Sequence, residues 1–180
     1  ARALRYGENP HQEAALYADP TDEPSVVTAD QLNEGAKGMS YNNYNDADAA
    51  LGLVREFTDP AAAVIKHTNP AGCATADSLA TAYDRALATD PMSAFGGIVA
   101  LNRECDSSTA EAIVDSFKEV VLAPGYTDDA LDVLFGKENL RVLDVGSFDR
   151  RPTHGESPPV ETYLPVGRLL QERDDQRLTP

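Results

Sequence analysis

Four short runs of apolar residues divide the chain, and segments with apolar residues at helical spacing lie between them. The runs are at 61–65, 97–101, 120–123 and 140–145. Nearly every position in them is apolar, which is typical of strands buried on both faces of a sheet. Helices are predicted at 44–57, 77–88, 107–117 and 128–135. This strand–helix alternation predicts an α/β fold with a mainly parallel sheet and helices packed on its faces.

Local signals mark the helix ends and a few shorter elements. The expected N-caps are Asn45 or Asp46 for the first helix, Ser107 or Ser108 for the third and Thr127 for the fourth. Glu111 stands where the capping-box partner of Ser108 would be, and Gly136 ends the fourth helix. Short strand-like segments are also expected at 14–17 and from 161 to 173.

Composition limits the possible partners. The 180 residues carry 15 Lys plus Arg against 30 Asp plus Glu, a net charge of −15. Such a surface excludes nucleic acid as the default partner, because phosphate binding needs clustered cations. No apolar run approaches the ~18 residues that a membrane span needs, and no signal peptide is visible, so no membrane partner is expected. The excess of short carboxylates, with only four lysines, favours a halophilic, salt-adapted protein over a merely acidic one.

The two cysteines, Cys73 and Cys105, form no CxxC pair. A disulfide framework and a zinc site are therefore not expected, and reduced thiols in the cytoplasm are the default. The chain does not begin with Met, which favours a processed protein or a segment of a longer one.

Candidate chemistry gathers next to the apolar runs. Lys66 and His67 directly follow the first run, which offers a cation beside a group that titrates near neutral pH, although a solvated loop pair fits about equally well. Phe95 and Gly96 precede the second run, where glycine allows a close backbone approach and the ring could stack on a base or belong to the core. Because ligands of parallel α/β sheets sit beyond the strands' carboxyl ends, both pairs are expected there, on neighbouring strands, with Arg5 brought near.

Five motifs occur in a recognisable order: LRYGENPHQ (4–12), SYNN followed by DADAA (40–50), KHTNPAG (66–72), SAFGGIVALNRE (93–104) and EVVLAP (119–124). With them the chain resembles the AICAR transformylase domain of the bifunctional enzymes of purine biosynthesis, which also carry IMP cyclohydrolase activity. The resemblance runs from about residue 4 to 173. It is least secure near Arg168, where the family segment is richer in glycine.

The resemblance implies a three-layer, cytidine deaminase-like α/β fold. Residues 1–145 would form the first such subdomain of the transformylase region, 146–160 a linker, and 161–180 a strand and the start of the connection to a second subdomain that is absent here. The zinc signature of true deaminases, which combines His-x-Glu with Pro-Cys-x-x-Cys, is missing because no Pro-Cys-x-x-Cys occurs, and no metal is expected.

The resemblance also implies roles for individual residues. Lys66 and His67 match the catalytic Lys–His pair. The residues that match nucleotide-binding or substrate-lining positions are Arg5, Tyr6, Asn42, Asn43, Phe95, Gly96 and Glu119. The implied reaction transfers a formyl group from 10-formyltetrahydrofolate, a co-substrate, to the 5-amine of AICAR, and the implied active site forms in a homodimer or with the second subdomain.

Three alternatives stay open at this point. The chain could be a non-catalytic purine-nucleotide-binding half-domain or regulator, which would have no need of the Lys66–His67 pair. A cyclohydrolase is disfavoured because the resemblance is to the transferase region. A zinc deaminase is disfavoured by the missing ligands.

Overall fold

A computed structural model describes residues 2–18, 24–33, 37–148 and 159–172. The chain divides into two units, Ala1–Phe148 and Asp149–Pro180. Most of the linker expected at 146–160 lies outside the described residues.

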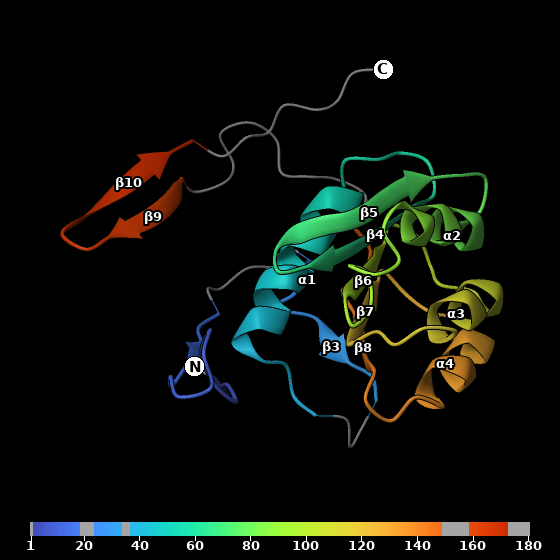
Figure 1. Cartoon of the computed structure of the whole chain (residues 1–180), viewed down its shortest axis with the longest axis horizontal. Helices are drawn as coiled ribbons and strands as arrows, with labels where there is room; N and C mark the ends of the chain where they lie inside the picture. The colour runs from blue at the N-terminus through green and yellow to red at the C-terminus, as the bar shows by residue number, and fades with distance from the viewer. Residues whose placement is uncertain (1, 19–23, 34–36, 149–158, 173–180) are drawn as a thin grey trace. The chain divides into compact units, whose positions relative to one another are not determined.

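The first unit is built on a six-stranded sheet with the order β3-β8-β7-β6-β4-β5 (Figure 1). Its strands are β3 (Asp30–Gln31), β4 (Ala61–Lys66), β5 (Asn69–Thr75), β6 (Ile98–Leu101), β7 (Val120–Ala123) and β8 (Arg141–Asp144). Its helices are α1 (Tyr41–Val54), α2 (Leu79–Thr89), α3 (Ser107–Val114) and α4 (Asp128–Phe135). The α/β class and all four expected helices are therefore confirmed, with shifts at several ends.

The expectation of a mainly parallel sheet is wrong, because the sheet is mixed. Only β6–β7 and β7–β8 pair in parallel, while β4 is antiparallel to both β5 and β6, and β3 is antiparallel to β8. A strand buried on both faces has the same apolar sequence whichever way its neighbours run, so the apolar runs carried no information on direction. Residues 69–75, for which the sequence predicted no strand, form β5, an edge strand that tolerates Pro70.

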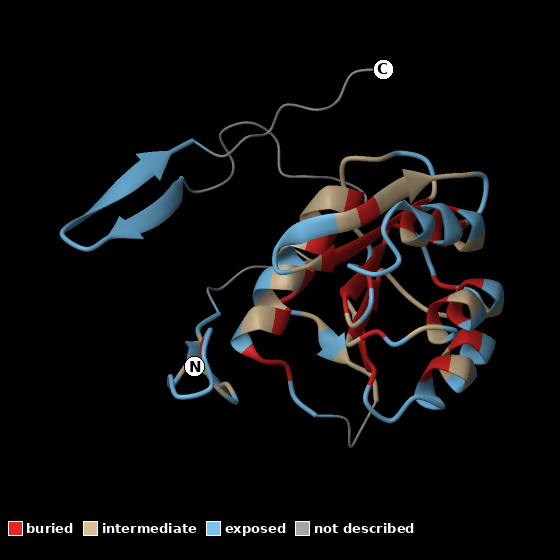
Figure 2. Ribbon diagram, in the orientation of Figure 1, coloured by how far each residue is buried: buried red, intermediate tan, exposed pale blue. Residues whose placement is uncertain are grey.

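Helices cover both faces of this sheet (Figure 1). Alternate strand residues point to opposite sides: Val99 of β6 belongs to the core shared with α2, α3 and α4, whereas Ile98 belongs to the core shared with α1. The central strands are buried along their length (Figure 2). Helix α2 packs directly against β5 at Gly72. A Cβ on Gly72 would lie 1.9 Å from the Ala86 carbonyl oxygen. Only glycine fits at that position.

Helix starts follow capping chemistry that was only partly foreseen. Ser40, rather than Asn45 or Asp46, caps α1 and forms a capping box with Asn43. Asp106 caps α3 in place of Ser107 or Ser108, and the expected box with Glu111 does not form. Thr127 caps α4 and Gly136 ends it, as expected.

Two small hairpins complete the described structure. In the first unit β1 (Arg2–Ala3) pairs with β2 (Ala15–Leu16). In the second unit β9 (Val160–Leu164) pairs with β10 (Gly167–Gln171), so the strand-like segment expected from 161 to 173 is a hairpin. No helix among the described residues is long and apolar enough to cross a membrane.

Candidate active site

Lys66 and the Phe95–Gly96 pair meet at one end of the sheet. Lys66 ends β4, and its Nζ donates a 2.6 Å hydrogen bond to the Phe95 carbonyl oxygen just before β6. The two motifs lie together because β4 and β6 are antiparallel, so the carboxyl end of one strand lies beside the amino end of the other. The expected neighbourhood is found, but Phe95 and Gly96 do not lie at a carboxyl end.

Gly96 and two phenylalanine rings shape the surface beside the Lys66 ammonium. Gly96 has a φ of 69°, and a Cβ there would lie 3.4 Å from the Phe117 ring and 3.7 Å from Lys66 Nζ. The Phe95 and Phe117 rings are tilted with centroids 5.5 Å apart, and 58% of Phe95 is exposed. Phe95 is therefore not a core residue, and its exposed ring can stack on a planar ligand.

His67 lies in the tight turn that joins β4 to β5. Both His67 and Thr68 have positive φ angles, 55° and 60°, which is the backbone that two-residue hairpin turns prefer. Such angles cost about 1–3 kcal/mol for each non-glycine residue, so surrounding contacts must hold them. The Asp46 carboxylate of α1 accepts hydrogen bonds from the backbone N–H groups of His67 (3.1 Å) and Thr68 (2.7 Å). Asp46, expected only as a helix cap, instead anchors this turn.

A second group of polar residues surrounds Glu119, which directly precedes β7. The Glu119 backbone N–H donates to the Gly97 carbonyl (3.1 Å), and Asn43 Nδ2 donates to Glu119 Oε2 (2.9 Å). Arg141 Nη1 lies 3.7 Å from the same carboxylate oxygen. The hydrogen bond from Asn43 and the ion pair with Arg141 thus fix the Glu119 carboxylate, and its partly exposed side chain is oriented for a ligand.

Arg141 is the site residue that sequence reasoning missed. It is buried at the start of β8, and its Nε donates to the Lys37 carbonyl (2.9 Å). Burial lowers the pKa of Arg141, Glu119 opposes that shift and Arg5 adds to it. Arg141 interrupts the apolar run at 140–145, and a charged residue inside a segment predicted to be a buried strand was the available signal.

The N-terminal segment reaches this group of residues. Asn42 Nδ2 donates to the Glu8 carbonyl (3.1 Å), which ties the segment to α1. The Arg5 guanidinium stacks over the Tyr6 ring at 5.3 Å. Both Arg5 and Tyr6 are close enough to Arg141 to affect its pKa. The nine residues singled out from the sequence all lie in the first unit, at the end of the sheet marked by Lys66 and Glu119.

This end of the sheet combines a lysine, a histidine, an exposed aromatic ring, two arginines and a fixed carboxylate. Such a set can bind a polar, planar, anionic ligand and move a proton. Among the described residues there is no cluster of three or more His, Cys, Asp or Glu that could hold a metal ion.

Comparison with known proteins gives one consistent family. The family model described as AICARFT/IMPCHase bienzyme matches residues 1–180. The chain is 56% identical over 177 residues to the "Bifunctional purine biosynthesis protein PurH" of Sorangium cellulosum, covering 97% of the chain and 33% of that relative. It is 47% identical over 178 residues to the protein of the same name from Lacticaseibacillus casei, covering 98% of the chain and 34% of the relative.

The chain thus spans about one third of the length of these curated relatives. The match extends over every element of both units, including the end of the sheet where Lys66, Phe95 and Glu119 lie. On this evidence the chain belongs to the AICARFT/IMPCHase bienzyme family of purine biosynthesis.

Proposed function

We propose that this chain provides the nucleotide-binding wall and the catalytic Lys–His pair of a formyltransferase in purine (IMP) biosynthesis. The reaction transfers a formyl group from 10-formyltetrahydrofolate to the 5-amine of AICAR and yields FAICAR. The observation that carries the proposal is the meeting of Lys66 with Phe95 and Gly96 at the sheet end that also holds Glu119. The names of the PurH relatives support a role in purine biosynthesis.

The chemistry explains why a lysine and a histidine are needed together. The AICAR amine is a poor nucleophile because it is conjugated with the ring and the carboxamide. As its nitrogen bonds to the formyl carbon, His67 takes the amine proton, a general-base role worth ~10²–10⁴-fold. The Lys66 ammonium stabilises the tetrahedral oxyanion. The bond from the formyl carbon to N10 of the folate then breaks, and N10 receives the proton that His67 had taken, which restores the neutral imidazole.

The remaining residues hold the nucleotide. Arg5 is placed to bind its anionic or carbonyl groups, and Tyr6 supports the guanidinium. Phe95 packs on the imidazole ring, and Gly96 allows the ligand to approach the backbone. Asn43 orients the Glu119 carboxylate, which contacts the nucleotide, while Asn42 secures the N-terminal segment. The proposed reaction requires no metal.

A complementary part is needed to complete this site. We propose that it is the second subdomain of the transformylase region, or a second protomer in a homodimer, and that each subdomain has the cytidine deaminase-like fold. The β9–β10 hairpin supports the need for a covering partner, since an isolated hairpin is marginal in water. Its exposed large apolar residues are Val160, Tyr163, Leu164, Val166, Leu169 and Leu170. A cytoplasmic location is proposed as well, in keeping with the free thiols Cys73 and Cys105.

A non-catalytic nucleotide-binding half-domain is the second candidate, favoured by the exposed Phe95 ring and the oriented Glu119 carboxylate, which suit binding without catalysis. In that case AICAR binds, but the Lys66–His67 pair has no chemical task. Measuring both binding and turnover therefore separates the two candidates.

The test is formyl transfer to AICAR by this chain alone, and then within a complete transformylase built on it. We expect little turnover from the chain alone, because positioning both reactants supplies ~7–11 kcal/mol of the barrier and the described residues offer no site for the folate. In the complete enzyme, His67→Ala and Lys66→Ala should each lower kcat at least about 100-fold, while AICAR binding stays measurable. Near-normal turnover in either variant would refute the roles assigned to the pair.

A further inference from the structure

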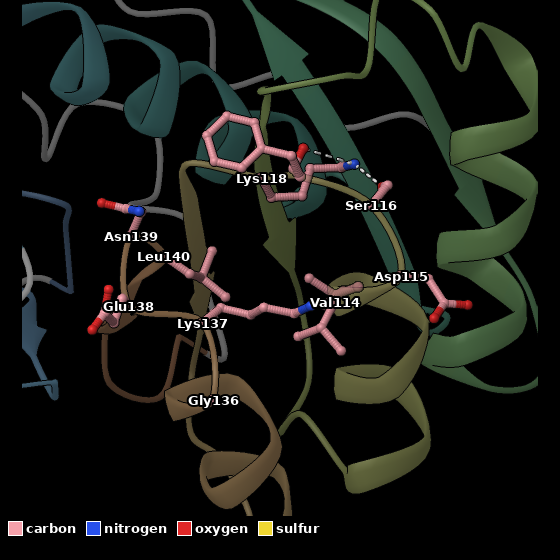
Figure 3. A pocket seen from close by; sticks show the side chains of 11 residues that line it. Val114, Asp115, Ser116, Lys118, Gly136, Lys137, Glu138, Asn139 and Leu140 are labelled. Carbon is pink, nitrogen blue, oxygen red and sulfur yellow. Dashed lines mark hydrogen bonds between the residues drawn. The ribbon is translucent and has the colours of Figure 1, made fainter.

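A cleft of about 440 Å³ lies between the end of α3 and the segment that follows α4 (Figure 3). It is lined by 113–118 on one side and 136–140 on the other. Two of the chain's four lysines, Lys118 and Lys137, line it. In a protein with a net charge of −15, two cations in one cleft are an unusual concentration.

Lys118 is a buried cation without a counter-charge. Only 3% of the surface of Lys118 is exposed. Its Nζ donates hydrogen bonds to the Ser116 hydroxyl and, at 3.4 Å, to the Phe117 carbonyl oxygen. It forms no ion pair with any carboxylate of the described residues. A buried ammonium normally requires an anionic partner, since removing it from water costs several kcal/mol. Burial lowers the pKa of Lys118 to about 8, which agrees with the missing counter-charge.

Neighbouring polar groups are also incompletely paired. The buried Tyr83 hydroxyl has no hydrogen-bond partner among the described residues, and Lys118 Nζ lies 6.0 Å from the centre of its ring. Burial raises the pKa of Tyr83, and the nearby Ser116 hydroxyl offsets part of that rise. Lys137 extends across the cleft toward Val114, and Glu138 and Asn139 point away from both lysines (Figure 3). Asp115, the other carboxylate of the lining, stands at the opposite edge in this view.

The cleft and the candidate active site both border on Phe117, but their charged side chains lie apart, although Lys118 and Glu119 are adjacent in sequence. In an extended segment such as the one that leads into β7, successive side chains point to opposite faces of the sheet. Lys118 contacts Tyr83 of α2, whereas Glu119 is bound by Asn43 of α1, on the other face of the sheet.

We propose that this cleft binds a small anionic group, a phosphate or a carboxylate, through Lys118, Lys137 and Ser116. The two ammonium groups supply the charge, and the Ser116 hydroxyl supplies a hydrogen bond. With Asp115 and Glu138 nearby, the site suits an anion of low charge rather than a polyanion. The ligand takes the place of the carboxylate that the fold does not provide for Lys118.

Solution NMR of the purified chain tests this proposal, with inorganic phosphate and succinate titrated separately at a constant ionic strength set with chloride. We expect saturable shifts of the Ser116, Lys118, Lys137 and Asn139 amides with at least one of the two probes. Saturation by phosphate only, or by succinate only, identifies the class of ligand. Saturation by neither, or shifts confined to residues around Arg5, would overturn the proposal.

Matched variants locate the binding. Lys118→Met should weaken it at least about tenfold, because it removes a charge-assisted hydrogen bond. Lys137→Met, at an exposed position that cannot disturb the core, should weaken it to a smaller extent. Lys37→Met makes the same charge change at an exposed residue that does not line the cleft, and Arg5→Gln changes the other site; neither should alter the affinity. Unchanged affinity in both cleft variants would contradict the assignment.

Discussion

At the scale of single residues, Arg141 and Lys118 differ in how their buried positive charge is compensated. Both side chains are buried, but Arg141 has the Glu119 carboxylate beside it and Lys118 has no carboxylate among the described residues. An arginine with such a partner is held in place by its ion pair, whereas an unpaired ammonium lowers stability. The two residues should therefore respond in opposite ways to substitution by an apolar residue of similar length.

Replacing Lys118 by Met should stabilise the chain in a pH-dependent way. The pKa is lowered from 10.5 to about 8, so between those values the unfolded chain binds more protons and stability rises with pH. The burial penalty is complete below about pH 8 and is relieved toward pH 10.5. Lys118→Met should therefore raise the free energy of unfolding at neutral pH by about 1–2 kcal/mol, with a gain that fades in alkaline solution.

Urea denaturation of both proteins in chloride buffers, at neutral and alkaline pH, measures this difference. Because both proteins share every other titrating group, their difference isolates Lys118. Lys37→Met controls for the loss of one positive charge. A gain that stayed constant with pH, or a loss of stability, would show that the ammonium is better compensated than its contacts indicate.

Asp46 should act as a positioning residue for the Lys66–His67 turn. Asp46→Ala removes the acceptor for the His67 and Thr68 backbone N–H groups, and we expect it to lower stability by about 1–2 kcal/mol. In a complete transformylase it should lower kcat more than it raises the KM for AICAR, since the nucleotide contacts remain. Asp46→Asn keeps one acceptor oxygen and should recover part of both losses. Equal effects of the two substitutions would argue against this role.

At the scale of elements, the start of α3 offers a clear test of capping. The Asp106 carboxylate accepts the Thr109 backbone N–H (2.9 Å), and hydrogen bonds from Thr109 and Ser108 lower the pKa of Asp106. Asp106→Ala should lower the free energy of unfolding by about 1 kcal/mol. Ser108→Ala should change it little, although Ser108 fits the capping-box pattern equally well by sequence.

The same pKa shift fixes the acid dependence of that cap. Because the folded pKa of Asp106 lies below its value of 3.8 in the unfolded chain, its contribution is complete above that pH and is lost as the pH falls through the folded pKa. The difference between wild type and Asp106→Ala should therefore vanish in strong acid. A larger loss for Ser108→Ala than for Asp106→Ala would mean that the helix begins elsewhere.

At the scale of the whole molecule, the first unit should be independent of the second. It contains both hydrophobic core clusters, one on each side of the sheet, while every described residue of the β9–β10 hairpin is exposed. In urea denaturation, a chain ending at Phe148 should therefore have the same free energy of unfolding as the 180-residue chain, within about 0.5 kcal/mol. A marked loss of stability would show that the hairpin segment contributes to the core of the first unit.

The net charge of −15 also acts on the whole molecule. We propose that the protein is adapted to high salt, where the repulsion among its carboxylates is screened within ~3 Å at 1 M. The proposed anion cleft fits this setting, because Lys118 lies in a buried position where salt screens its interactions least.

Sequence alone determined the features that depend on neighbours along the chain. The apolar runs at 61–65, 97–101, 120–123 and 140–145 correspond to β4, β6, β7 and β8, because short segments so rich in apolar residues are stable when both faces of the strand are buried. Thr127 and Gly136 bounded α4 because capping involves groups only a few residues apart. The motifs around Lys66, Phe95 and Glu119 indicated a purine-related site because those residue types carry its chemistry.

Tertiary structure decided what depends on residues distant in the sequence. The antiparallel pairing of β4 with β6 joins segments far apart in the sequence, and the turn between β4 and β5 is held by Asp46 of another element. The partnership of Asn43, Glu119 and Arg141 joins three elements. Lys118 is buried without a counter-charge partly because it packs against Tyr83, which lies 35 positions earlier in the sequence. Strand direction, ion pairing and burial are properties of contacts between distant segments, and no local pattern encodes which segments will meet.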